Sequence, residues 1–180
     1  MEKILTDGTI RLRPFSIDDV QFWYEAACES IDDFSKWIPN VTKNYTIEQA
    51  KEYVHGHVEN WKKETAFGFV VQNVSDFELV GGCGISFINN RHKFANLWCW
   101  TRKTATRNGF SYAALKLVAQ FGFSELGLER LELVVVSSNK KSIQLVEKLE
   151  PIKEGILRNR IFLNGSSHDA IIYSLIPGEV

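Results

Sequence analysis

Residues 96–111, which read N-L-W-C-W-T-R-K-T-A-T-R-N-G-F-S, constrain the fold of this chain more than any other stretch. Trp98, Cys99 and Trp100 suit a buried β-strand, and the residues that follow them are mostly polar or basic. From Phe110 onward, apolar residues recur at the spacing of one helix face. The stretch therefore predicts a strand that runs through a tight turn into the first turn of a helix.

A turn in this position is suited to hold an anion. The first amide groups of a helix have no intrahelical partner and the helix dipole is positive there, so a phosphate or pyrophosphate is favoured. Gly109 permits an unusual backbone conformation or a close ligand approach, and Arg107 adds a positive charge. The same residues also fit an ordinary connection between strand and helix, and the pattern alone leaves both interpretations open.

Length and charge restrict the remaining classes of protein. The 180 residues suffice for one domain (residues 1–180), and 21 Lys and Arg against 22 Asp and Glu give no extended basic surface for nucleic acid. The chain has no apolar signal-peptide core near its start and no run of the roughly 20 apolar residues that cross a bilayer. We therefore expect a cytoplasmic protein without nucleic-acid or membrane partners.

Cysteine and histidine spacing predicts neither disulfides nor a metal site. Cys28, Cys83 and Cys99 are odd in number, far apart and in apolar surroundings, so we expect small buried side chains. His55 and His57 lie two positions apart on a predicted helix and therefore point to different sides of it.

The periodicity along the chain predicts alternating groups of strands and helices. A strand at 9–15 leads through a cap at 16–19 into a helix that ends near Cys28, and a loop around Phe34, Trp37 and Pro39 follows. Thr46 and Gln49 form a capping box at the start of a second helix. The other expected segments are strands at 67–72, 79–88 and 94–100, a helix from 110, a strand at 131–136 covered on both faces, a helix at 139–149 and a hairpin of 156–163 with 168–175. Together they predict an α+β fold of about seven strands and about four helices, in which the glycine run at 81–84 marks a bulge or tight strand packing.

Four blocks in this order resemble the GNAT superfamily of N-acetyltransferases. The blocks are T-I-R-L-R-P-F-S-I-D-D at 9–19, F-S-E-L-G-L-E-R-L-E-L at 123–133, N-K-K-S-I-Q-L-V-E-K-L at 139–149, and E-G-I-L-R, F-L-N-G-S-S-H-D and Y-S-L within 154–175. They cover nearly the whole chain and are most similar to the branch of the bacterial ribosomal-protein N-terminal acetyltransferases. The resemblance implies a mostly antiparallel twisted sheet and direct transfer of an acetyl group from acetyl-CoA to a primary amine, with no metal.

The resemblance also implies which residues hold acetyl-CoA. In the family a loop of Gln or Arg, two residues, Gly, one residue, and Gly or Ala binds the pyrophosphate. The matching positions here are Thr106, Arg107, Asn108, Gly109, Phe110 and Ser111, with departures from the family pattern at Thr106 and Ser111. The backbone of Trp100 and Thr101 would lie along the pantetheine arm, opposite residues 133–136, where two strands separate.

Asn139 and Ser142 match the family's Asn-x-x-Ser at the start of a helix. The resemblance implies catalytic roles for both, with Asn139 beside the pantetheine arm and Ser142 as the acid that protonates the CoA thiolate. By residue type alone, Ser138 or Asn139 is simply a helix N-cap. The next turn departs from the family, because Leu149-Glu150-Pro151 stands where relatives have Leu-Gly-Phe, and we expect this helix to end without a left-handed residue.

The group that removes the amine proton is not identified by the resemblance. Relatives have Glu where this chain has Asn96 and Ile161, neither of which accepts a proton at neutral pH. Three alternatives remain: a water chain to another residue, an α-amine of pKa about 7.7–8.0 that arrives partly deprotonated, or a loss of catalysis. The residues at which such a water chain would end are His168, Asp169, Glu132 and Asp33.

Trp37 and Asp33 lie in the region that lines the acceptor site in relatives, so the resemblance implies that they bind substrate, although a packed loop fits equally. The branch implies a protein or peptide N-terminal α-amine as acceptor. A small-molecule amine and a CoA-binding protein without transferase activity stay open, and exposed strand edges in this fold are compatible with a homodimer.

Overall fold

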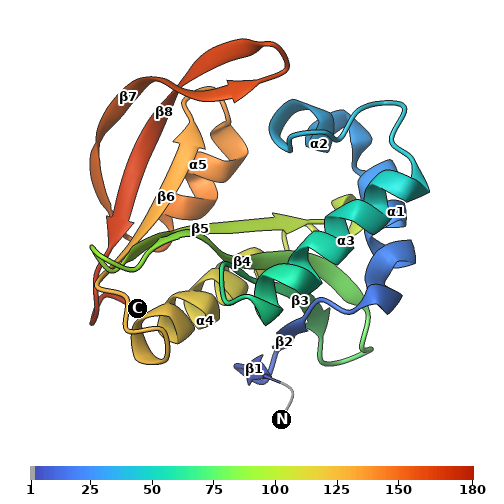
Figure 1. The fold of residues 1–180 in the computed structure, drawn as a ribbon, viewed down its shortest axis with the longest axis horizontal. Helices are drawn as coiled ribbons and strands as arrows, with labels where there is room; N and C mark the ends of the chain where they lie inside the picture. The colour runs from blue at the N-terminus through green and yellow to red at the C-terminus, as the bar shows by residue number, and fades with distance from the viewer. Residues whose placement is uncertain (1–2) are drawn as a thin grey trace.

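The computed structural model describes residues 3–180, which form eight strands in one sheet and five α-helices (Figure 1). The strands are β1 (Leu5–Thr6), β2 (Ile10–Pro14), β3 (Phe67–Asn73), β4 (Leu79–Asn89), β5 (Phe94–Thr101), β6 (Arg130–Val136), β7 (Ile152–Leu163) and β8 (Ser166–Leu175). The helices are α1 (Val20–Glu29), α2 (Ile31–Trp37), α3 (Ile47–Lys62), α4 (Phe110–Ser124) and α5 (Lys140–Glu147), with 3-10 turns at Ile17–Asp19 and Lys103–Ala105. The sheet order is β1-β2-β3-β4-β5-β6-β8-β7, and β5 with β6 is the one parallel pair among the described strands. The predicted α+β fold is confirmed.

Helices cover both faces of the sheet and create two cores (Figure 1). On one face, α4 buries Ala114, Leu115 and Val118 against β2 to β6. On the other face, the ring of Trp23 in α1 stacks on Tyr53 of α3, with centroids 4.2 Å apart. Trp23 Nε1 also donates to the hydroxyl of Tyr45 at 2.7 Å, so the indole N–H of Trp23 is paired inside this mainly aromatic core.

The two predicted helix caps are present. Thr46 Oγ1 accepts from the Gln49 N–H, and Gln49 Oε1 accepts from the Thr46 N–H, which completes the capping box of α3. Asp19 makes the corresponding box with Ser16, and its carboxylate also accepts from both terminal nitrogens of Arg13 at 2.8 and 2.7 Å. These local contacts agree with the sequence because capping involves residues only a few positions apart.

Several sequence predictions differ from the structure. Residues 31–37 form α2 instead of a loop, because Phe34 packs on Trp23 and Trp100 and a run this short shows no periodicity. β6 is covered on both faces only at its C-terminal end, where Val135 and Val136 are both buried; before it, Leu131 and Leu133 are buried while the alternate residues are partly exposed. The short strand β1 was not anticipated, and Cys28 is exposed, whereas Cys83 is buried as expected.

The glycine run at 81–84 makes a close approach between β4 and β5. A Cβ on Gly82 would lie 2.7 Å from the indole of Trp100, and one on Gly84 would lie 2.7 Å from the indole of Trp98. β4 stays in regular register with β5 along this run, which indicates tight packing, and a register shift between β3 and β4 lies directly before it at Val80. None of the described helices is long and apolar enough to span a membrane.

His57 on α3 gives the fold a predictable pH dependence. Its ring stacks on Phe15 at 4.6 Å, its Nδ1 is buried without a partner in the described chain, and burial lowers the pKa of His57 to about 4. An unfolded histidine has a pKa of about 6.5, so between these values the unfolded state binds a proton that the folded state excludes. The free energy of unfolding should therefore fall by up to about 3 kcal/mol as the pH drops from 6.5 toward 4.

Urea unfolding at pH 7 and pH 4.5 measures this loss. His57→Phe keeps an aromatic ring at this position and removes the titrating group. Its free energy of unfolding should therefore depend less on pH than that of the unchanged protein. His55→Phe is the matched control, because His55 lies two positions away on the same helix and is exposed. An unchanged slope in His57→Phe would assign the acid sensitivity to other groups.

Candidate active site

The parallel strands β5 and β6 pair briefly and then separate. Phe94–Asn96 pair with Arg130–Glu132, and no further pair joins them although β5 continues to Thr101 and β6 to Val136. β4 and β8 remain paired along the outer sides of the two strands. The sheet therefore contains a wedge-shaped opening between the C-terminal ends of β5 and β6.

Backbone groups of β5 point into this opening. The Arg102 N–H donates to the Val80 carbonyl on β4 at 3.0 Å, and peptide groups alternate in direction along a strand. The backbone N–H groups of Cys99 and Thr101 therefore face β6, whereas the backbone N–H of Trp100 faces β4. The expectation for Thr101 fits this geometry, but Cys99, and not Trp100, offers the second amide; the side chain of Trp100 belongs to the aromatic core.

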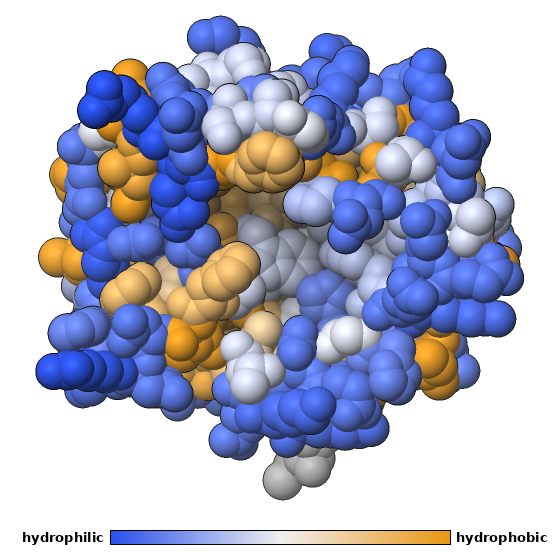
Figure 2. Space-filling model, turned by 45° about the horizontal axis from the view of Figure 1, so that its top comes forward, coloured by the Kyte–Doolittle hydropathy of each residue, from blue (hydrophilic) through white to orange (hydrophobic). Residues whose placement is uncertain are grey.

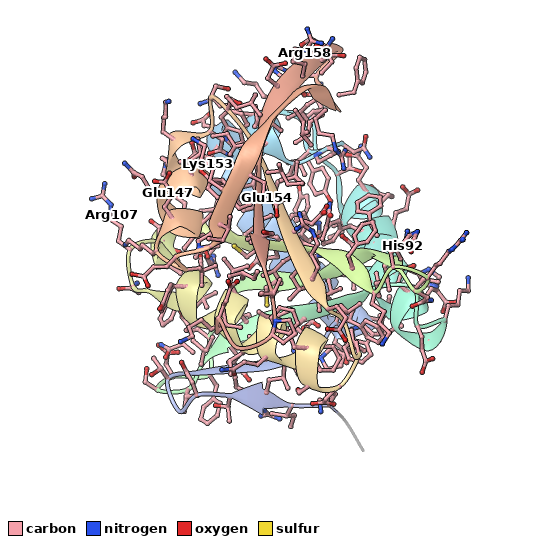
Figure 3. All side chains as sticks on the ribbon, turned by 90° about the vertical axis from the view of Figure 1, so that its left-hand side faces the viewer. His92, Arg107, Glu147, Lys153, Glu154 and Arg158 are labelled. Carbon is pink, nitrogen blue, oxygen red and sulfur yellow. The ribbon has the colours of Figure 1, made fainter. Side chains whose placement is uncertain are left out.

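The turn after β5 exposes the N-terminus of α4. Gly109 is the N-cap residue with φ 80°, no side chain caps the helix, and nothing lies within 4 Å of where a Cβ would stand. Arg107 also has a left-handed backbone, with φ 70°, and Figure 3 shows its side chain projecting into solvent. The first amides of α4 are thus open to an anion of the size of a phosphate.

Polar side chains stabilise the turn instead of filling it. Thr106 Oγ1 donates to the Lys103 carbonyl at 2.9 Å, and Asn108 Nδ2 donates to the Ala105 carbonyl at 3.3 Å. The hydroxyls of Thr101 and Ser111 lie 2.5 Å apart and join the end of β5 to the first turn of α4. The departures from the family at Thr106 and Ser111 thus serve the backbone geometry.

Cys99 borders this hydroxyl pair but is not activated. Burial raises the pKa of its thiol to about 12, although a hydrogen bond with Ser111 acts in the opposite direction. At neutral pH the thiol stays protonated, and a thiol is a poor nucleophile. Cys99 therefore contributes its backbone N–H, and not its thiol, to the opening.

Across the opening, the end of β6 leads into α5. Asn139 is the N-cap of α5, and its Oδ1 accepts from the Ser142 N–H at 3.2 Å. The Ser142 hydroxyl is partly exposed and has no hydrogen-bond partner among residues 3–180. Ser137 was not found from the sequence, but its hydroxyl is buried without a partner in the described chain, at the same end of β6.

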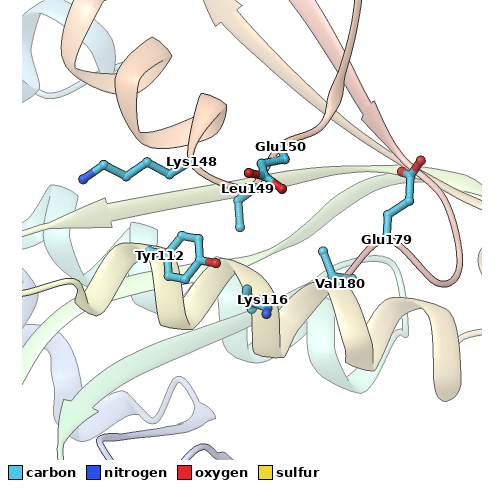
Figure 4. Close-up of a pocket in the computed structure, with 7 residues that line it drawn as sticks. All are labelled: Tyr112, Lys116, Lys148, Leu149, Glu150, Glu179 and Val180. Carbon is cyan, nitrogen blue, oxygen red and sulfur yellow. The ribbon is translucent and has the colours of Figure 1, made fainter.

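The end of α5 differs from its prediction. Glu150 has φ 54°, so the chain turns through a left-handed residue even though glycine is absent. A non-glycine residue in this conformation costs about 1 kcal/mol, which the buried Leu149 beside it helps to offset. A polar cavity of about 210 Å³ lies between this end of α5, the first turns of α4 and the C-terminus, and Figure 4 draws the residues that line it. Tyr112, Lys116, Lys148, Leu149, Glu150, Glu179 and Val180 line it.

Helix α2 bridges the two sides of the opening. Its Phe34 packs against Trp100 of β5 with ring centroids 5.7 Å apart. On the other side, Asp33 accepts from Lys141 of α5 at 2.8 Å, and the carbonyl of Ser35 accepts from Asn164 of the β7–β8 turn at 3.0 Å. Figure 2 shows a hollow in the face where these elements meet.

The two residues expected to bind substrate both lie on α2. The hydrogen bond from Lys141 is the main cause that lowers the pKa of the Asp33 carboxyl, so Asp33 is an ion-paired carboxylate and a weak base. Trp37 ends α2, is partly exposed, and has no ring contact with another described aromatic side chain. Trp37 is therefore the aromatic residue of α2 that stays accessible.

The other conceivable bases are also engaged in contacts. Glu132 accepts from Arg130 at 2.9 Å, and Arg130 also pairs with Glu154, which Figure 3 shows on β7. Asp169 accepts from the Asn159 N–H at 2.9 Å, within the β7–β8 hairpin. His168 Nε2 lies 3.3 Å from the carbonyl of Leu163 and from the hydroxyl of Ser166, again inside the hairpin. Asn96 forms the last β5–β6 pair, and Ile161 pairs with His168.

An opening lined by backbone amides thus lies beside an uncapped helix N-terminus, an arrangement that suits a cosubstrate with an anionic group. The model of the acetyltransferase (GNAT) domain matches residues 9–150, and this chain belongs to that family of N-acetyltransferases.

Individual relatives agree with this assignment. The chain is 27% identical over 176 residues to the uncharacterized N-acetyltransferase YoaA of Bacillus subtilis, and the match covers 98% of each chain. It is 26% identical over 164 residues to the spermidine N(1)-acetyltransferase of Escherichia coli K12, covering 91% of this chain and 83% of that one. Its fold is similar to that of RimL, a ribosomal L7/L12 alpha-N-protein acetyltransferase solved with coenzyme A, with a TM-score of 0.86, 17% identity and coverage of 97% and 98%.

Proposed function

We propose that this N-acetyltransferase takes its acetyl group from acetyl-CoA and transfers it to the α-amine of a protein or peptide N-terminus. The observation that carries the cosubstrate assignment is the exposed start of α4, where Gly109 leaves open space in front of uncapped amides. RimL, whose fold is similar, is solved with coenzyme A, and the pyrophosphate of coenzyme A suits such a site. Residues 106–111 supply the backbone for it, and Arg107 supplies an exposed cation.

The remaining parts of acetyl-CoA match features on either side of this turn. The amides of Cys99 and Thr101 are donors for the pantetheine arm and for the thioester carbonyl oxygen inside the opening. Lys116 and Lys148 line the polar cavity beside α4 and provide cationic side chains for the nucleotide. Asn139 and Ser142 lie on the opposite wall, at the start of α5.

The α-amine is favoured because the four candidate bases within residues 3–180 are all engaged in contacts. Asp33, Glu132, Asp169 and His168 all make contacts that hold the fold together. At pH 7.5 about a third of an α-amine with a pKa near 7.9 is deprotonated, against about 0.1% of a lysine-like amine with a pKa near 10.4. An enzyme without a strong base therefore gains about two orders of magnitude in reactive acceptor from an α-amine.

Ser142 is proposed as the acid that returns a proton to the leaving thiolate, since its hydroxyl is available and its backbone N–H is fixed by Asn139. Ser142→Ala should reduce kcat by about 10²-fold and change the affinity for acetyl-CoA by less than about threefold. Ser138→Ala is the control, because it alters an exposed neighbouring serine. Equal kcat values for Ser142→Ala and the unchanged protein would leave Ser142 a purely structural residue.

The function is tested by titration calorimetry with acetyl-CoA and then by release of CoA thiol with a panel of acceptors. The panel contains N-terminal peptides with a free α-amine, the same peptides with a blocked α-amine and one lysine, and spermidine. Turnover confined to the free α-amine supports the proposal. Turnover with spermidine alone would show that the acceptor is a polyamine and not an α-amine. Binding without turnover would indicate a CoA-binding protein, in which Asn96 and Ile161 stand in place of the Glu residues of relatives.

A further inference from the structure

The turn between β5 and α4, which is the proposed phosphate-binding turn, is hydrogen-bonded to the junction of α1 and α2. Glu29 is the last residue of α1, and Ser30 lies between the two helices. Glu29 Oε1 accepts from the Thr104 N–H at 2.7 Å, and its Oε2 accepts from Arg102 Nη2 at 2.6 Å and Nε at 3.1 Å. Ser30 Oγ accepts from the Lys103 N–H at 3.0 Å. Two residues far away in sequence thus hold three consecutive residues of the turn.

These contacts give Arg102 a structural role. Its guanidinium lies between the Glu29 carboxylate and the ring of Phe22, whose centroid is 5.9 Å away. Both charged side chains are only 23% exposed, so water screens the pair less than it screens a surface pair. Burial acts to raise the pKa of the Glu29 carboxyl, but the bonds from Arg102 and Thr104 outweigh it and lower the pKa below its ordinary value. The guanidinium of Arg102 is therefore directed at Glu29 and Phe22, and not at a ligand.

The same junction sets the start of α2. The N–H groups of Asp33 and Phe34 both donate to the Ser30 carbonyl, at 2.9 and 2.8 Å. Glu29 and Ser30 thus link residues 102–104 to the helix that carries Asp33 and Trp37. Because α2 bridges the opening, Glu29 and Ser30 contact both the turn at 102–104 and the helix that carries the residues expected to bind the acceptor.

We propose that Glu29 is a positioning residue that fixes the phosphate-binding turn and couples its occupation to the placement of α2; the coupling rests on the proposed use of a CoA ester. Acetyl-CoA then orders the acceptor side of the site, and by linkage an acceptor bound against α2 raises the affinity for acetyl-CoA.

Amide hydrogen exchange with CoA as the probe tests this coupling. In the unchanged protein, CoA should slow exchange both in the turn at 102–108 and in α2 at 31–37. In Glu29→Ala, the dissociation constant for CoA should rise about tenfold and the slowing in α2 should be lost. Glu29→Gln keeps an acceptor for Thr104 but loses the charge that holds Arg102, so its effects should be intermediate, and it serves if the alanine variant folds poorly.

Lys141→Ala is the matched control. It frees α2 from α5 by breaking the pair with Asp33 but touches no residue of the turn, so the CoA affinity and the slowing at 102–108 should persist. Unchanged CoA affinity together with unchanged slowing of α2 in Glu29→Ala would overturn the coupling.

Exchange without CoA separates this inference from the proposed function. The Thr104 amide should exchange faster in Glu29→Ala than in the unchanged protein, because its acceptor is gone. Equal exchange rates would overturn the positioning role even if CoA binds. Faster exchange in a protein that shows no CoA binding by calorimetry would support the positioning role and overturn the cosubstrate assignment.

Discussion

Gly109→Asp should weaken the binding of CoA at least about 100-fold, equivalent to about 2.7 kcal/mol, while the fold is retained. Gly109 has φ 80° and no atom within 4 Å of its Cβ position, so the new side chain fits without a clash. Aspartate tolerates this backbone better than most residues, but it places a carboxylate in front of the helix amides. Repulsion of the pyrophosphate and occupation of those amides then act together.

Gly127→Asp separates the electrostatic effect from backbone strain. Gly127 lies between α4 and β6, also has a left-handed backbone with φ 62°, and also has no atom within 4 Å of its Cβ position. Both variants place an aspartate in a left-handed backbone, but only Gly109→Asp should lose CoA binding in titration calorimetry. A parallel loss of affinity in both would show that the start of α4 is not the anion site.

Gly84→Ala should destabilise the fold by at least about 3 kcal/mol, at the upper end of the cost of overpacking. A Cβ on Gly84 would collide with the carbonyl oxygen of Phe67 and would lie 2.7 Å from the indole of Trp98 and 2.9 Å from Gly68 Cα. Backbone atoms of a central strand cannot move aside as the tip of a flexible side chain can. Thermal or urea unfolding measures the loss.

Gly56→Ala is the control, because it should change the free energy of unfolding in the opposite direction. Gly56 lies inside α3 with no atom within 4 Å of its Cβ position, so alanine should stabilise the protein by about 0.5–1 kcal/mol through helix propensity. If Gly84→Ala were as mild as Gly56→Ala, the close approach of β3, β4 and β5 would be less tight than the structure gives it.

Local patterns were sufficient for much of the fold. The capping boxes at Ser16 and Thr46, the strand from Phe94 and the helix from Phe110 depend on residues close together in sequence, and each was predicted to within a residue or two. Helix α2 was missed because its stability comes from Phe34 packing against Trp23 and Trp100, which lie far away in the chain. The left-handed Glu150 was missed for a related reason, since propensity argues against a conformation that the packing of Leu149 favours.

For the site, the sequence by itself determined where an anion-binding helix start can form, because the order of strand, polar turn, Gly109 and amphipathic helix is a local property. Only the tertiary structure decided which groups face that site. The separation of β5 from β6 selects the amides of Cys99 and Thr101, and Arg102 is turned away by Glu29, 73 residues earlier in the chain. Such choices depend on strand register and on ion pairs between distant segments, and neither leaves a periodic signal in the sequence.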